Sequence, residues 1–240
     1  MFVGSSGEAA VRPHSVVNIL VHGIGPVGRQ FDPGEEQVWV STEQFERLLD
    51  AVAERSDVRV SFDDGNSSDV EVALPRLVER GLTAEFFLLA GLLGERGRVD
   101  RAGVGALLDA GMAIGSHGWS HRDWRRIDSA QAREELDDAH RVLGEVIGRP
   151  VSRVAIPFGS YDRHVLRLLR EAGVTRAYTS DGGRAKPDAW LQARTSVRQD
   201  MDAAWIARVL NPDTSLTQLA RGTVVRAVKR LRGRSCSAAV

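Results

Sequence analysis

Residues 58–65, Val-Arg-Val-Ser-Phe-Asp-Asp-Gly, decide the fold class, because an apolar run ends here in two adjacent carboxylates and a glycine. The run predicts a buried β-strand, and Gly65 permits a sharp turn directly after it. Similar apolar bursts along the chain predict about seven strands. They are Val16–Val21, Val58–Phe62, Ala84–Leu89, Met112–Ile114, Val151–Ile156, Thr175–Tyr178 and Leu191–Val197.

Segments with helical spacing of apolar residues separate these strands. Ser41 and Gln44 have the spacing of a capping box at the start of one helix. Asp128 and Gln131 repeat this signal before a helix that we expect to end at Gly148. Strands that alternate with helices predict a parallel α/β architecture.

Two architectures fit this alternation, an open sheet and a closed barrel. Polar residues follow at least four of the predicted strands, namely His22, Asp63 with Asp64, His117, and the segment 157–162. In a (β/α) barrel such residues converge at one mouth, whereas an open sheet offers fewer such loops to one site. The sequence therefore favours a single-domain α/β fold, a distorted (β/α) barrel of about seven parallel strands.

Composition and charge limit the function classes. The chain has 240 residues, of which 42% are hydrophobic, enough for one sizeable core. Its 32 basic and 32 acidic residues give zero net charge, so nucleic acid is not an expected partner. The single cysteine, Cys236, excludes an intrachain disulfide. With no apolar run of about 18 residues and no signal-like start, we expect a cytoplasmic protein.

Three regions are expected along the chain. Residues 1–15 form a loose arm, 16–210 the barrel domain and 211–240 a basic C-terminal segment. This last segment combines an apolar stripe with many arginines, which is typical of a helix docked on its own domain. The alternative is a helix that makes peripheral contact with an anionic membrane surface. The sequence does not indicate the oligomeric state.

The two carboxylates and a histidine pair point to metal chemistry. Neighbouring residues on an extended strand point in opposite directions, so one of Asp63 and Asp64 can bind a metal while the other acts as a base. An ordinary Asp-Asp-Gly turn is the plain alternative. His117 and His121, four residues apart, are expected on one face of a helical turn, a spacing with which two imidazoles share one zinc ion.

Three motifs resemble those of the polysaccharide deacetylases, which remove N-acetyl groups from amino sugars. Residues 61–65 resemble their T-F-D-D-G motif, 117–121 their H-S/T-x-x-H motif and 155–159 their R-P-P-Y-G motif, and the resemblance covers roughly residues 16–197. It implies an N-acetylated amino sugar as the substrate. The resemblance also implies a divalent metal, usually zinc, with Co²⁺ or Ni²⁺ as alternatives. The implied roles are general base for Asp63 and metal ligands for Asp64, His117 and His121.

The third motif suggests further site residues. The resemblance implies that the backbone N–H of Phe158 stabilises the oxyanion, in a turn that Pro157 helps to fix. Ala155 stands where many members have an arginine that orients the catalytic aspartate. We expect Arg194 to take over this role. Trp119 and Tyr161 flank the motifs, so they are candidates either to stack on sugar rings or to pack in the core.

Two other departures from the family pattern bear on the mechanism. Gly118 replaces the Ser or Thr between the histidines, which removes a hydroxyl that would brace the loop. No histidine follows His164, so the late L-x-H motif that supplies the general acid in many members is missing. His22 resembles the early Tyr-His motif of the branch acting on poly-N-acetylglucosamine-type substrates. It is our candidate acid, the alternative being a structural histidine.

Other functions remain open at this point. One is a hydrolase of a different C–N bond, in a formamide or a cyclic ureide. Another is a catalytically silent barrel that binds glycans. Residues 23–28 also match the dinucleotide-binding pattern G-x-G-x-x-G, but a loop follows them where that site needs a helix, so we expect them to shape a loop over the pocket.

Overall fold

The strands form a nearly closed barrel sheet in the order β10-β8-β7-β6-β5-β4-β1-β11, and neighbours along this path are parallel. The computed structural model describes residues 13–211 and 228–229. The barrel strands are β1 (Val16–Val21), β4 (Val58–Asp63), β5 (Ala84–Leu88), β6 (Ala113–Ser116), β7 (Arg153–Ala155), β8 (Arg176–Thr179), β10 (Leu191–Ala193) and β11 (Thr195–Ser196). The predicted strands and the predicted barrel are confirmed.

The barrel closes at a single residue, Arg194. The predicted last strand is divided there into β10, which pairs with β8, and β11, which pairs with β1. One short segment therefore reaches both edges of the sheet. β9 (Arg184–Ala185) adds an antiparallel pairing to β1, and β2 (Gly23–Ile24) pairs with β3 (Trp39–Val40) outside the barrel.

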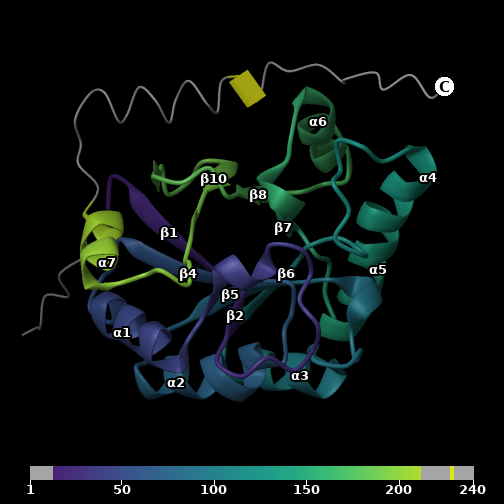
Figure 1. The fold of residues 1–240 in the computed structure, drawn as a ribbon. Helices are drawn as coiled ribbons and strands as arrows, with labels where there is room; N and C mark the ends of the chain where they lie inside the picture. The colour runs from purple at the N-terminus through teal and green to yellow at the C-terminus, as the bar shows by residue number, and fades with distance from the viewer. Residues whose placement is uncertain (1–12, 212–227, 230–240) are drawn as a thin grey trace, which may run out of the picture.

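Helices cover the outside of the sheet (Figure 1). They are α1 (Thr42–Val52), α2 (Leu74–Glu79), α3 (Arg101–Asp109), α4 (Ser129–Ala132), α5 (Ala139–Ile147), α6 (Arg163–Glu171) and α7 (Ala203–Leu210). Both predicted capping boxes are present, at the starts of α1 and α4. The helix predicted to run on from Asp128 is interrupted by a π-helix, Arg133–Asp138, before α5 continues to Ile147.

Packing between strands and helices explains which side chains enter the barrel. Phe62 is fully buried and contacts Phe45 of α1 and Phe86 of β5, with ring centroids 6.0 Å and 4.5 Å away. Side chains alternate along a strand, so the packing of Phe62 against α1 turns Ser61 and Asp63 to the interior. The apolar face of β4 thereby directs a catalytic candidate toward the barrel mouth.

Most of the predicted N-terminal arm and most of the predicted basic segment lie outside the described residues. The residues not described are 1–12, 212–227 and 230–240. In the described ranges, no helix is both long enough and apolar enough to cross a membrane. The cytoplasmic location and the membrane contact stay predictions.

Candidate active site

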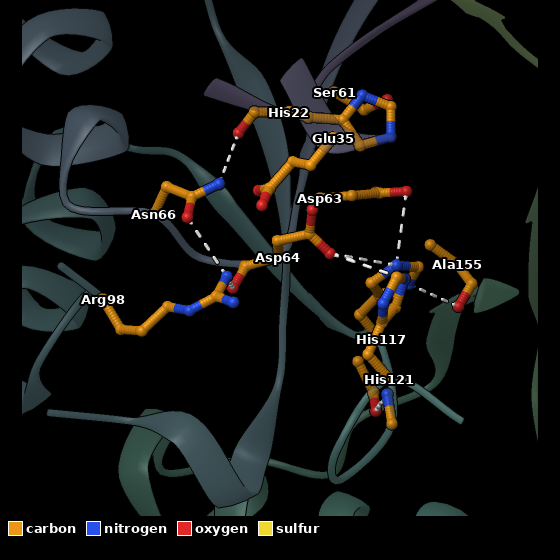
Figure 2. Close-up of polar contacts among 12 residues, drawn as sticks. His22, Glu35, Ser61, Asp63, Asp64, Asn66, Arg98, His117, His121 and Ala155 are labelled. Atoms are coloured by element: carbon orange, nitrogen blue, oxygen red, sulfur yellow. Dashed lines mark hydrogen bonds and ion pairs between the residues drawn. The ribbon is translucent and has the colours of Figure 1, made fainter. Parts of the chain in front are cut away.

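A cavity of about 610 Å³ lies at the carboxyl ends of the barrel strands. Its lining includes His22 after β1, Asp63 and Asp64 at the end of β4, and His117 with His121 after β6. Figure 2 shows the two carboxylates directed toward the His117 ring, with His121 beside it. The barrel thus brings the predicted base, the predicted metal ligands and the predicted acid to one cavity.

Asp64, His117 and His121 offer ligand atoms that all lie within 4.8 Å of one another. The Asp64 Oδ1 atom is 3.5 Å from His117 Nε2 and 3.7 Å from His121 Nε2. This oxygen is buried and has no hydrogen-bond partner among the described residues. Nitrogen and oxygen donors in this number suit a divalent metal with open positions, so these residues fit the ion that the sequence implies.

The carbonyl of Ala155 orients the first histidine. His117 Nδ1 lies 2.9 Å from this oxygen, so the tautomer with the proton on Nδ1 donates a hydrogen bond to it. In that tautomer Nε2, the atom facing Asp64, keeps its lone pair for a metal. Ala155 therefore contributes its backbone to the site although it lacks the arginine of the family motif.

The two histidines do not lie on a helical turn, so that expectation is wrong. Residues 117–121 form a loop in which Gly118 has φ 92° and His121 φ 61°. These left-handed conformations bring the two imidazole centroids to 5.0 Å. Asp64 also has a positive φ of 75°, which is uncommon for a residue other than glycine, and such strain is typical of functional sites.

A buried carboxylate, Glu135, braces the histidine loop. It accepts hydrogen bonds from the backbone N–H groups of Trp119 and Ser120, at 3.0 Å and 3.1 Å, and from Trp124 Nε1 at 3.1 Å. A Cβ atom on Gly118 would lie 2.3 Å from Glu135 Oε2. We expected the loop to lack a brace because position 118 has no hydroxyl. Glu135 provides this brace, and its carboxylate leaves room only for glycine at position 118.

Arg194 holds Asp63 in a two-pronged ion pair. Its Nη1 and Nη2 atoms donate to the two carboxylate oxygens at 2.7 Å and 2.6 Å, and both side chains are buried. The guanidinium also donates to Ser61 Oγ and to the carbonyl of Thr179, at 3.2 Å each. The structure thus places Arg194 where it can orient Asp63, as the sequence analysis expected.

Both carboxyls are held in the ionised form. Burial alone would raise the pKa of Asp63, but Arg194 and then His117 outweigh it, so this pKa lies below the usual 3.8. Burial likewise opposes ionisation of Asp64, yet His121 and His117 lower its pKa to about 2. A site built on two ionised carboxylates favours a bound cation.

His22 is half-buried, and its imidazole faces the same cavity. Burial lowers its pKa, while Asp64 and Asp63 act in the opposite direction. The Nδ1 atom is buried and has no hydrogen-bond partner in the described part of the chain. An imidazole that is neutral near pH 7 and carries an unused nitrogen can take up a proton from the reaction and pass it on.

Asn66, which the sequence analysis did not identify, connects the loops around the cavity. It is fully buried, its amide donates to the carbonyl of His22 at 2.8 Å, and its Oδ1 accepts from Arg29 and Arg98. Arg98 also donates to the backbone carbonyl of Asp64 at 3.0 Å. The available signal was its position directly after Asp-Asp-Gly, where a polar residue can tie the turn to its neighbours.

Two side chains of the third motif, Ile156 and Phe158, line the cavity. Phe158 has φ 57°, is 63% exposed, and its ring lies 4.3 Å from that of His121. Pro157 is buried at the start of this turn. The structure does not bring Trp119 or Tyr161 to the cavity lining: Trp119 packs against the core near Gly91, and the buried Tyr161 donates its hydroxyl to Asp181 at 2.7 Å.

The sequence profile of polysaccharide deacetylases matches residues 50–177, more than half of the chain and the part that supplies Asp63, Asp64 and both histidines. The chain belongs to the polysaccharide deacetylase family. Among its relatives in this family are YxkH of Bacillus subtilis (strain 168), 23% identical over 59% of the chain and 50% of that protein, and a chitin deacetylase of Pestalotiopsis sp., 30% identical over 48% and 38%. The chain thus spans half the length of these relatives or less.

Solved deacetylase structures share the barrel. The Streptococcus pyogenes deacetylase PplD in complex with acetate gives a TM-score of 0.72 at 17% identity, over 83% of this chain and all of that one. BC0361, a polysaccharide deacetylase from Bacillus cereus, gives 0.71 at 20% identity over 82% of this chain and 69% of that one. At these identities the likeness establishes the fold, and the activity has to be argued from the site.

Removal of Arg194 is expected to destabilise the protein strongly. Arg194→Ala leaves the Asp63 carboxylate buried without its partner, a change that costs about 3–5 kcal/mol of unfolding free energy. Urea unfolding measures this loss. Addition of Asp63→Asn to Arg194→Ala should restore part of it, because the uncompensated charge is then gone. Equal stability of Arg194→Ala and the unsubstituted protein would contradict the buried pair.

Asp69 gives a pH-dependent prediction. It is fully buried, neither carboxyl oxygen has a partner among the described residues, and burial raises its pKa well above 3.8, with Asp64 adding to the effect and Arg98 opposing it. The native state therefore binds this proton more tightly than the unfolded state. The stabilising contribution of this proton is fully present below pH 3.8 and is lost as pH rises from there through the folded pKa.

Asp69→Asn should remove this pH dependence and raise stability near pH 7. A tenfold difference in proton affinity corresponds to about 1.4 kcal/mol. Urea unfolding between pH 4 and 8, with a chelator present to exclude metal binding, compares Asp69→Asn with the unsubstituted protein. A parallel pH dependence in the two proteins would argue against a protonated Asp69.

Proposed function

We propose that the chain is a metal-dependent hydrolase that removes an N-acetyl group from an amino sugar in a glycan, glycolipid or glycoside. The observation that carries this proposal is the pairing, in one cavity, of an Asp-His-His ligand set with a second carboxylate, Asp63, fixed by Arg194. Membership of the polysaccharide deacetylase family supports it, as does the relative named as a chitin deacetylase.

Asp64, His117 and His121 would hold the metal, with zinc as the expected ion and Co²⁺ or Ni²⁺ as alternatives. When bound, such an ion polarises the acyl carbonyl and makes water more acidic. His117 is kept in the ligating tautomer by Ala155, and the lone Asp64 oxygen faces both imidazoles. The second buried carboxylate, Asp63, is then free of ligation and available for proton transfer.

Asp63 would take the proton from the attacking water. Arg194 binds one lone pair on each of its oxygens, which fixes the carboxylate plane and leaves a second lone pair on each for the water. The backbone N–H of Phe158 would donate to the developing oxyanion at the cavity wall. His22, on the side of β1, would deliver a proton to the leaving amine.

The first experiment combines metal content with product identity. We expect about one zinc or related divalent ion per chain by elemental analysis, and release of acetate from N-acetylated oligosaccharides or glycosides. Release of formate or ring-opened ureide in place of acetate would move the activity to another C–N bond. Binding of oligosaccharide with no turnover in the metal-loaded protein would indicate a glycan-binding barrel and overturn the proposal.

A further inference from the structure

A second cavity, of about 400 Å³, lies at the opposite end of the barrel. Three arginines at or near the starts of their strands line it: Arg59 is the second residue of β4, Arg153 the first of β7 and Arg176 the first of β8. Arg153 and Arg176 are direct register partners on neighbouring strands. The strand register therefore concentrates guanidinium groups at the amino-terminal mouth, away from the candidate active site.

The positive charge of this cavity is only partly balanced. Glu85 is the one carboxylate among its described lining residues; it accepts from Arg153 at 3.2 Å and from the Tyr178 hydroxyl at 2.7 Å. Three guanidinium groups and one carboxylate leave a net charge of +2 (3 − 1). In the described ranges no ion pair joins Arg59 or Arg176 to a carboxylate within 4.0 Å. Arg176 interacts with the neutral Tyr178 hydroxyl, so the positive charges of both arginines are available to a ligand.

The positive charges of Arg59 and Arg176 also repel each other. Burial lowers the pKa of Arg59, and Arg176 and then Arg153 lower it further, while Tyr178 and Asp188 act in the opposite direction. The one hydrogen bond that Arg59 makes here is to the carbonyl of Pro187, at 3.3 Å. A dianion between the two guanidinium groups would relieve this repulsion and supply the missing acceptors.

We propose that this cavity binds a phosphate-bearing anion, with Arg59 and Arg176 as its principal donors. The net charge of +2 matches a phosphate dianion, whereas a single carboxylate would leave one guanidinium uncompensated. Arginine forks suit the oxygens of a phosphoryl group, which can accept from both side chains at once. Asn18 also lines the cavity, and its buried Oδ1 atom, which has no hydrogen-bond partner among the described residues, can accept from a hydroxyl of a substituent on the phosphate.

Thermal unfolding in inorganic phosphate tests this site, with chloride adjusted to keep ionic strength constant. We expect a saturable rise in Tm for the unsubstituted protein and a loss of apparent affinity of about tenfold or more in Arg59→Gln/Arg176→Gln. Arg141→Gln, on the exposed part of α5, is the matched control and should behave as the unsubstituted protein. His117→Ala should keep the shift, which separates this cavity from phosphate bound to a metal at the other mouth.

A second ligand distinguishes free phosphate from a phosphorylated metabolite, and a second variant keeps the test valid if the double variant does not fold. Glucose 6-phosphate binding more tightly than inorganic phosphate would indicate a phosphorylated metabolite, and equal binding a free anion. If the double variant unfolds, calorimetric titration of phosphate into Arg176→Lys, which keeps the charge but loses the fork, should show weaker binding. No saturable shift in the unsubstituted protein, or the same shift in the folded double variant, would overturn the site.

Discussion

Asp63→Asn is expected to lower kcat for acetate release by about 10³-fold or more while the metal stays bound. General base catalysis contributes roughly 10²–10⁴-fold, and an amide cannot accept the proton from water. The ligand set itself, Asp64 with the two histidines, is unchanged by this substitution. Initial rates of acetate release, together with elemental analysis of the same preparation, measure both quantities.

The controls separate chemistry from folding. Asp63→Asn keeps one of the two acceptors for Arg194 but removes the counter-charge of the buried guanidinium, so far-UV circular dichroism has to show that the variant is folded. Asp100→Asn is a matched substitution, because Asp100 caps α3 and asparagine caps helices equally well. A metal-loaded Asp63→Asn enzyme that retains a tenth of the normal rate, free of contaminating deacetylase, would exclude Asp63 as the base.

His117→Ala should abolish both metal binding and activity. The substitution removes one of three ligands and leaves the carbonyl of Ala155 without its donor, so we expect the content to fall from about one ion per chain to near zero after dialysis. Activity should fall at least as far as in Asp63→Asn. The two variants thus differ in one respect, since only His117→Ala loses the ion.

His140→Ala is the matched control for this loss. His140 is a half-buried histidine of α5 outside the cavity, so the same change of side chain there should leave the metal content intact. Metal retained at an equal level in His117→Ala would remove His117 from the ligand set. In that case the close approach of the two imidazoles to Asp64 would need a different explanation.

The parts of the site that the sequence could predict are those that depend on strand alternation. Phe62 must face the helices, so Asp63 faces the interior and Asp64 follows at the mouth. Arg194 could be proposed because it lies in the last predicted strand and the ends of all parallel strands meet at one mouth; in the structure it directly follows β10. These positions follow from the order of residues within one strand, so they can be predicted without knowing which distant residues they contact.

The parts that the sequence could not predict depend on contacts between distant segments. Glu135 braces the histidine loop from 15 to 16 residues away, and nothing distinguishes it from the other carboxylates of its helix. Tyr161 is drawn away from the cavity by Asp181, 20 residues further on. The helical turn expected for His117 and His121 failed because the left-handed residues Gly118 and His121 set the geometry of that loop.

The position of Arg194 between β10 and β11 makes closure of the barrel and orientation of Asp63 a single event. The ladders on its two sides are short, with three register pairs to β8 and two to β1, so local opening is expected to be easier at this seam than at the five-pair ladder between β1 and β4. Fraying there would part the guanidinium from the carboxylate while the surrounding helices stay folded. Catalytic competence therefore depends on two short ladders, and inactivation is expected to precede global unfolding.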